Sequence, residues 1–258
     1  MKRNVNLDLV RAVAIILVMV NHTFKLGEMS LPQAGIRCIA LAGVPLFLML
    51  TGYLNHNKTC EDYYIKGKWR GCIRILTAYL VLGTICYIIG NFFDGKDFSI
   101  KDFILKLSSF KLTPYGWYIE MWIGLFFFTP FLNMIVRQLS DNSEKILLVT
   151  LAFFTCIASF FNRNGINILP NFWISLYPIT LYFIGYYISR HEINIPKWFT
   201  IGYITIIAIG EPLFNLIVSS KQYLYFWGGQ DDIVYGVLAI VIFVNIKKMD
   251  LRCIKGGG

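Results

Sequence analysis

Residues 6–25 read NLDLVRAVAIILVMVNHTFK, and this stretch decides the fold class. It is a mostly apolar run of the length that crosses a bilayer as an α-helix, about 20 residues. Comparable runs recur along the whole chain. We place eight spans, at approximately 6–25, 36–54, 72–93, 115–137, 145–162, 172–189, 197–219 and 232–247. Because lipid offers an open backbone no hydrogen-bond partners, the sequence predicts an all-α, polytopic transmembrane helix bundle. We expect one domain over residues 1–258.

The composition supports a lipid environment. Of the 258 residues, 56% are hydrophobic and only 15% are charged, whereas a soluble domain has about 25% charged residues. The net charge of +9 does not indicate nucleic acid, because the basic residues are scattered between apolar runs. The six cysteines form no CxxC pair and no zinc-type spacing, so we predict no disulfide framework and no metal site. We also expect no bound cofactor.

Lysine and arginine placement predicts the topology. With the N-terminus in the cytoplasm, fifteen of these residues fall in inside segments and eight, Arg37 among them, in outside segments. Cytoplasmic segments carry the excess, so we predict a cytoplasmic N-terminus. The first run lacks a small-residue cleavage site and is read as a retained helix. Phe98–Phe110 is read as a short amphipathic helix on the outer surface, with an ordinary polar loop as the alternative.

Arg11 and His22 are the sharpest functional signal. They are eleven residues apart, close to three helical turns, so both point to one face about 16 Å apart along the axis. Ionisable residues inside a span usually mark a functional path. Arg11 would lie in the cytoplasmic half and His22 near the outer end. The alternatives are that Arg11 snorkels to the inner interface, helped by Asp8, and that His22 is a packed interfacial residue.

A carboxylate and two arginines complete the candidate site. Glu120, near the start of the fourth span, should lie at the depth of His22, where it could orient the imidazole and raise its basicity. The alternative is a headgroup-level carboxylate within an aromatic belt. Glu211 is a weaker candidate of the same type. Arg70 and Arg74, one turn apart, could bind a polyphosphate ligand, or could only anchor the topology.

These motifs resemble a known family. Residues 7–14, LDLVRAVA, followed by Asn21 and His22, resemble the opening motif of the acyltransferase 3 family of bacterial integral membrane O-acyltransferases. In that motif ten residues separate an Arg from a His in the first helix. Residues 43–54 and 74–79 resemble the second- and third-helix segments. Residues 115–133 are similar to the fourth-helix segment of members that modify capsular polysaccharides.

Two features depart from the family pattern. The family usually has two arginines three apart at the third helix, whereas Arg70 here precedes Arg74 by four and Gly71 takes the usual place. Family members usually have about ten spans and a last helix with an Ile-Tyr-Leu-type motif, whereas we place eight spans and find no such ending. The chain closes with three glycines after Lys255, and we interpret this ending as a truncation near residue 255.

The resemblance implies a chemistry. Acyl-CoA, usually acetyl-CoA, would be the cytoplasmic donor, and a hydroxyl of a cell-surface glycan or its lipid-linked precursor the acceptor. His22 would be the general base, and Arg11, Arg70 and Arg74 would hold the donor. We add Glu120 as the assisting carboxylate and expect a multi-pass protein of the bacterial cytoplasmic membrane. The alternative is a transporter or exporter of a glycan or small metabolite. The exact acceptor, the oxyanion donor and the oligomeric state stay open.

Overall fold

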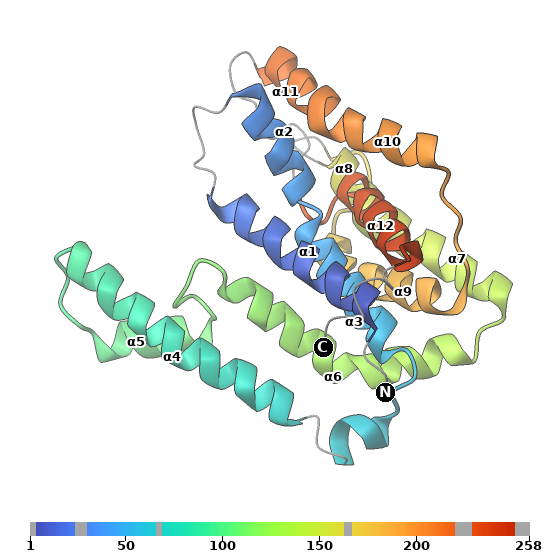
Figure 1. Ribbon diagram of the computed structural model, residues 1–258. Coiled ribbons are helices and arrows are strands. Elements are labelled where there is room, and N and C mark those ends of the chain that lie inside the picture. The colour runs from blue at the N-terminus through green and yellow to red at the C-terminus, as the bar shows by residue number, and fades with distance from the viewer. Residues whose placement is uncertain (1–3, 24–29, 66–68, 163–166, 220–228, 251–258) are drawn as a thin grey trace. The chain divides into compact units, whose positions relative to one another are not determined.

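The computed structural model describes residues 4–23, 30–65, 69–162, 167–219 and 229–250, and their regular elements are all helices (Figure 1). The predicted all-α class is therefore confirmed for this part of the chain. The chain divides into two compact units, which are described separately. Unit 1 comprises residues 1–56 and 140–258, and unit 2 comprises residues 57–139. The chain end near Lys255, where we expected a truncation, lies outside the described residues.

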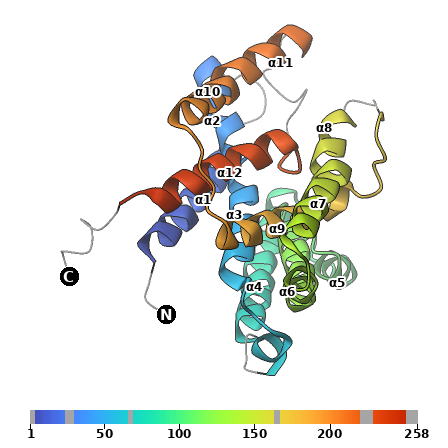
Figure 2. The same cartoon turned by 90° about the vertical axis from the view of Figure 1, so that its right-hand side faces the viewer.

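Unit 1 contains nine α-helices among its described residues, joined in places by short π- and 3₁₀-helical turns (Figure 2). The α-helices are α1 (Val5–Thr23), α2 (Leu31–Ala40), α3 (Gly43–Asn55), α7 (Asp141–Ala152), α8 (Ala158–Phe161), α9 (Tyr177–Arg190), α10 (Lys197–Thr205), α11 (Glu211–Ser219) and α12 (Ile233–Lys248). The π-helical turns are η2 (Phe153–Ile157) and η4 (Ile206–Gly210), and the 3₁₀ turn is η3 (Ile174–Leu176).

Six described stretches are long and apolar enough to cross a membrane. They are Val5–Thr23, Leu31–Asn55, Trp69–Phe93, Gly116–Arg137, Asp141–Phe161 and Lys197–Ile217. The two other predicted spans coincide with α9 and α12, which have 14 and 16 residues. A helix needs about 17 to 25 residues to span the hydrocarbon core. The chain is thus a multi-pass membrane protein, while the count of eight spans and the cytoplasmic N-terminus remain predictions.

Helices α3 and α9 pack closely in the core of unit 1, and two glycines allow this. A Cβ atom on Gly185 would lie 1.9 Å from the Met49 carbonyl oxygen, and one on Gly52 would lie 2.0 Å from the Tyr182 carbonyl oxygen. No side chain fits at these distances, so glycine is required at both positions. Small residues at such crossings let helix backbones approach each other in membrane proteins, where dispersion forces drive the association.

Helix α1 packs on α2, α3 and α12 (Figure 1). Its buried residues Leu7, Val10 and Ala14 recur at the spacing of one helical face. Gly43 at the start of α3 lies close to α1, since its Cβ would be 2.9 Å from the Val18 backbone nitrogen. The Asn6 side-chain amide donates hydrogen bonds to backbone carbonyls at the end of α12. The core of unit 1 therefore fixes the orientation of α1 and its polar residues.

Pro212 explains the π-helical turn η4. Proline has no N–H, so it cannot donate the helical hydrogen bond to the Ala208 carbonyl four residues earlier. The chain widens there, as helices do at single π-type turns. The Ala208 carbonyl instead faces Gly35 of α2, whose Cβ would lie 2.1 Å from that oxygen. Helix α2 and η4 are thus in backbone contact, and Glu211 follows directly after this contact.

Unit 2 contains η1 (Glu61–Ile65), α4 (Trp69–Phe93), α5 (Ile100–Ser108) and α6 (Gly116–Arg137). Helix α4 carries large apolar side chains that the other helices of unit 2 leave uncovered. Leu82 is 60% exposed and Phe92 is 79% exposed. Contiguous apolar surface of this kind is unfavourable in water and typical of a helix that contacts lipid.

The predicted amphipathic helix is confirmed as α5, and the polar-loop alternative is wrong. The Ser99 side chain caps it by accepting from the Asp102 backbone N–H. Phe103 and Leu107 pack against the buried tyrosines of α4, so α4 covers part of the apolar face. Lys106 lies 2.8 Å from the Asp102 carboxylate, and this contact lowers the pKa of Asp102. The position of α5 on the outer membrane surface stays a prediction.

Candidate active site

Arg11 and His22 both lie on α1, which is continuous between them, so the predicted common face is confirmed. Both side chains are exposed in the structure. Arg11 Nη1 lies 3.1 Å from Asp8 Oδ1, one turn earlier. This ion pair is the contact that the anchoring alternative predicted for Arg11. With the Arg11 side chain 49% exposed, the pair is a weak one, and a stronger anion could replace it.

Arg37 lies inside a helix, which the sequence did not predict. We expected it among the charges of an outside segment, but α2 begins at Leu31 and Arg37 lies in its last turn, only 8% exposed. The predicted start of the second span, residue 36, was also too late, since α2 begins at Leu31. Gln33 accepts a hydrogen bond from the Ser30 backbone N–H, and Pro32 occupies the first turn. Because Ser30 and Gln33 are polar, the start of α2 resembled a loop, although Ser and Pro are also typical of a helix N-terminus.

Arg37 and His22 lie at the same end of unit 1. Helices α1 and α3 meet where Gly43 contacts Val18. From this contact α1 continues one turn to His22, and α2, which precedes α3, lies beside that end of α1 (Figure 1). The charge of Arg37 acts electrostatically on the His22 imidazole. The structure therefore brings a buried guanidinium to the candidate base.

Arg37 belongs to a buried polar group that we name the Arg37 cluster: Arg37, Cys38, Glu211 and Tyr235. Three helices contribute, because α2 packs on η4 and α11 and Tyr235 lies in α12. The Tyr235 hydroxyl donates a hydrogen bond to Glu211 Oε1. Cys38 interacts electrostatically with both Glu211 and Arg37. Glu211 is 7% exposed, so the carboxylate that looked weaker in the sequence is a buried member of this cluster.

One sequence signal could have identified these residues. Arg37 is flanked by Ile36, Cys38 and Ile39, and Glu211 precedes Pro212 within an apolar run. Charged residues in such runs are costly unless they are paired or functional. Tyr235 carried no comparable signal, because a tyrosine in an apolar run reads as core.

In unit 2, Arg70 and Arg74 lie on one exposed face of α4, as their spacing predicted. The buried residues of this helix, Cys72, Tyr79, Gly83 and Tyr87, lie on the opposite side at 100° per residue. The two guanidinium groups are therefore turned away from the packed face of α4. Their role in donor binding stays a prediction.

Glu120 lies in the second turn of α6 and is exposed. Trp122, two residues later, stacks on Phe126 with ring centroids 5.4 Å apart. Aromatic neighbours of this kind fit both readings of Glu120, the assisting carboxylate and the headgroup-level residue of an aromatic belt. Glu120 belongs to unit 2 and His22 to unit 1, so the predicted pair stays a prediction.

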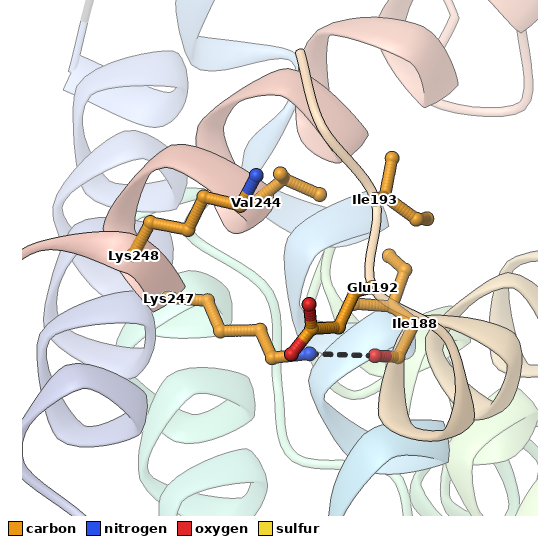
Figure 3. Close-up of a pocket in the computed structure, with 6 residues that line it drawn as sticks. All are labelled: Ile188, Glu192, Ile193, Val244, Lys247 and Lys248. Atoms are coloured by element: carbon orange, nitrogen blue, oxygen red, sulfur yellow. Dashed lines mark hydrogen bonds between the residues drawn. The ribbon is translucent and has the colours of Figure 1, made fainter.

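A cavity of about 320 Å³ lies at the opposite end of unit 1 from His22, between the ends of α9 and α12 (Figure 3). Ile188, Glu192, Ile193, Val244, Lys247 and Lys248 line it. Lys247 Nζ donates to the Ile188 carbonyl oxygen at 2.9 Å, and Figure 3 shows the Glu192 carboxylate beside the same amine. The carbonyl and the carboxylate offset the positive charge of Lys247 in this cavity.

The architecture and the polar residues define a class of protein. A multi-pass helical membrane protein carries an Arg and a His on one face of its first helix, with a buried Arg–Glu–Tyr group beside the His. A family model described as an acyltransferase domain, that of the acyltransferase 3 family, matches residues 4–248. The chain belongs to the acyltransferase 3 family and is a membrane acyltransferase. No curated protein and no solved structure matches it significantly.

Proposed function

We propose that this protein transfers an acetyl group, or another short acyl group, from cytoplasmic acyl-CoA to a hydroxyl of a cell-surface glycan or its lipid-linked precursor in the bacterial cytoplasmic membrane. The observation that carries the proposal is that the buried Arg37 lies at the same end of unit 1 as His22, in a chain of an acyltransferase family. The two residues could supply a base and a positive charge, which are the two groups that acyl transfer to a hydroxyl needs.

The donor would be held by arginines. The exposed face of Arg70 and Arg74 on α4 suits the phosphates of CoA, since guanidinium groups grip phosphate through paired hydrogen bonds. Arg11 would exchange its exposed contact with Asp8 for a phosphate or a carbonyl of the donor. The pantetheine arm would then follow the Arg11–His22 face of α1, which is about 16 Å long, and bring the thioester to His22.

The chemical step begins with His22 as general base. Its imidazole removes the proton of the acceptor hydroxyl while the hydroxyl oxygen attacks the thioester carbonyl carbon. The carbonyl oxygen becomes negatively charged in the tetrahedral intermediate. The C–S bond then breaks, the new ester is released, and the CoA thiolate takes the proton from the His22 imidazolium. Glu120 stays proposed as the carboxylate that orients the imidazole.

Arg37 is the proposed oxyanion donor. It is buried, positively charged and electrostatically coupled to His22. A fixed charge aimed at the developing oxyanion stabilises the transition state more than the ground state. The hydrogen bond from Tyr235 to Glu211 Oε1 holds a second charged member of the Arg37 cluster in place. This arrangement would limit the movement of Arg37 during the reaction.

The function is tested with membranes that contain the full chain and acetyl-CoA labelled in its acetyl group. We expect base-labile label in the glycan or lipid-linked fraction, with saturable dependence on acetyl-CoA. Arg70→Ala and Arg74→Ala should each raise the KM for acetyl-CoA about tenfold, the effect of losing roughly 1.4 kcal/mol of charged contact. Lys101→Ala, which removes a cation from α5 of the same unit, is the matched control.

Two results would argue against this proposal. Movement of a glycan or small metabolite across the membrane without consumption of acyl-CoA would favour the transporter. An unchanged KM in both arginine variants would leave Arg70 and Arg74 as topology anchors.

Replacing Arg37 tests the oxyanion assignment. Arg37→Gln should lower kcat about 100-fold, the usual effect of losing one oxyanion-stabilising group, with little change in the KM for acetyl-CoA. Arg37→Lys should retain part of the activity, because it keeps the charge but not the forked geometry. Arg137→Gln, which removes an exposed guanidinium from the end of α6, serves as control. A wild-type kcat in well-folded Arg37→Gln would exclude the role.

A further inference from the structure

A second polar group lies far from His22, where the start of α7 meets the end of α9. Asp141, Glu144 and His191 each offer one ligand atom, and these atoms all lie within 4.8 Å of one another. Asp141 and Glu144 are three residues apart and therefore share a face of α7. Helices α7 and α9 pack directly against each other (Figure 2), which brings His191 to that face.

Glu144 is buried in a way that its protein contacts do not fully compensate. Its side chain is 2% exposed. Arg190 Nη1 lies 3.3 Å from Glu144 Oε2, and His191 Nε2 lies 3.6 Å from the same oxygen. The other oxygen, Glu144 Oε1, is buried and has no hydrogen-bond partner among the described residues. A buried carboxylate oxygen without a partner destabilises the folded protein. A cation bound at this oxygen would offset that cost.

The surrounding structure holds the ligand atoms in place. The Ser140 side chain caps α7 by accepting from the Ser143 N–H at 3.3 Å, which orders the turn that carries Asp141 and Glu144. The His191 ring stacks on Tyr187 with centroids 4.1 Å apart, and its backbone N–H donates to the Tyr187 carbonyl at 3.0 Å. His191 Nε2 is buried and, within the described residues, makes no hydrogen bond. Both buried ligand atoms therefore point into one site.

From this geometry we infer that Asp141, Glu144 and His191 form a binding site for a divalent transition-metal cation that joins α7 to α9. Two carboxylates and one imidazole are ligands that Zn²⁺ accepts, whereas Mg²⁺ and Ca²⁺ prefer oxygen alone. Ligand atoms around a tetrahedral Zn²⁺ lie about 3.3 Å apart, so small side-chain rotations bring these three into range. The exposed side of Asp141 leaves a fourth position to water.

The charge balance supports a cation. Two carboxylates and one guanidinium, Arg190, leave a net charge of −1 around a neutral His191. A divalent ion would bind Glu144 Oε1, Asp141 and His191 Nε2, while Arg190 would keep its contact with Glu144 Oε2. A carboxylate that is shared between a metal and a second partner is common in metal sites, where the outer partner orients the ligand. The cysteine spacing predicted no metal site, and sequence spacing could not indicate this one because His191 follows Glu144 by 47 positions.

The test uses the full chain purified in detergent and freed of metal with a chelator. We expect Zn²⁺, and not Mg²⁺, to raise the unfolding temperature by a few degrees and one equivalent of zinc to remain bound after desalting. Asp141→Asn and His191→Ala should each lose this equivalent and the shift. Asp141 is exposed, so its variant keeps the fold. Glu192→Gln, next to His191 but outside the site, should behave as the wild type.

Two outcomes would overturn the inference. If the wild type binds no more zinc than Asp141→Asn and His191→Ala, the site holds no metal. If zinc leaves every unfolding temperature unchanged while Arg190→Gln lowers it, the group is an ion-pair network between α7 and α9. Both readouts are independent of acyl transfer, so a failure here does not bear on the proposed function.

Discussion

His22→Ala is expected to lower the rate of acyl transfer about 1,000-fold. A positioned general base contributes roughly 10²–10⁴-fold, and without His22 the hydroxyl proton would have to leave to water. The fold should persist, because His22 is exposed at the end of α1 and alanine is the best helix former. The KM for acetyl-CoA should change little, since the proposed donor contacts lie at the arginines. Steady-state transfer of labelled acetyl from acetyl-CoA measures both constants.

His56→Ala is the matched control for His22. His56 follows α3 in the same unit, at the opposite end of α1 from His22, and its Nδ1 lies 2.7 Å from the Tyr53 carbonyl oxygen. It therefore has a local structural contact and no place in the proposed mechanism. Its variant should keep most of the wild-type turnover. A His22→Ala protein that turns over like the wild type would rule out His22 as the base.

Gly52→Ala and Gly185→Ala are expected to disrupt the fold of unit 1. Each added methyl group would lie about 2 Å from a backbone carbonyl oxygen, so α3 and α9 would have to separate. Overpacking in a well-packed core typically costs 1–3 kcal/mol and occasionally more. We expect about 3 kcal/mol or more here, because the obstacle is helix backbone and no side chain can rotate away. The yield of monodisperse protein and its unfolding temperature in detergent measure the effect.

Gly202→Ala provides the control for both glycine variants. Gly202 lies in α10, and a Cβ there meets nothing within 4 Å. Alanine should be neutral or stabilise the helix by about 0.5–1 kcal/mol. Equal yields and unfolding temperatures for all three variants would show that α3 and α9 do not approach each other as closely as described.

The membrane helices could be predicted because their signal is local. Each predicted span has a helical counterpart, since about 20 apolar residues in a row favour a helix in lipid whatever their neighbours are. Helices that begin with polar residues were harder to predict. Helix α2 begins at Leu31, five residues before the predicted span, because Ser30, Pro32 and Gln33 made its first turn look like a loop. The periodic apolar residues of α5 predicted this helix, but they did not predict its contact with α4.

The candidate site could be predicted only in part. Arg11 with His22, and Arg70 with Arg74, each share one helix, and helical periodicity alone places each pair on one face. The Arg37 cluster joins α2, α11 and α12, so its members are brought together by packing. Glu211 and Tyr235 lie more than 170 positions after Arg37 in the chain, and no periodicity relates residues on separate helices.

The sequence by itself determined that this chain is a helical membrane protein with an arginine and a histidine on one face of its first helix. Both conclusions follow from hydropathy and the helical repeat, which act within one segment. The tertiary structure alone decided that Arg37 is buried near His22, that Tyr235 binds Glu211, and that His191 meets Asp141 and Glu144. These contacts depend on how closely the helices approach one another, which glycines such as Gly35, Gly52 and Gly185 control through the absence of a side chain.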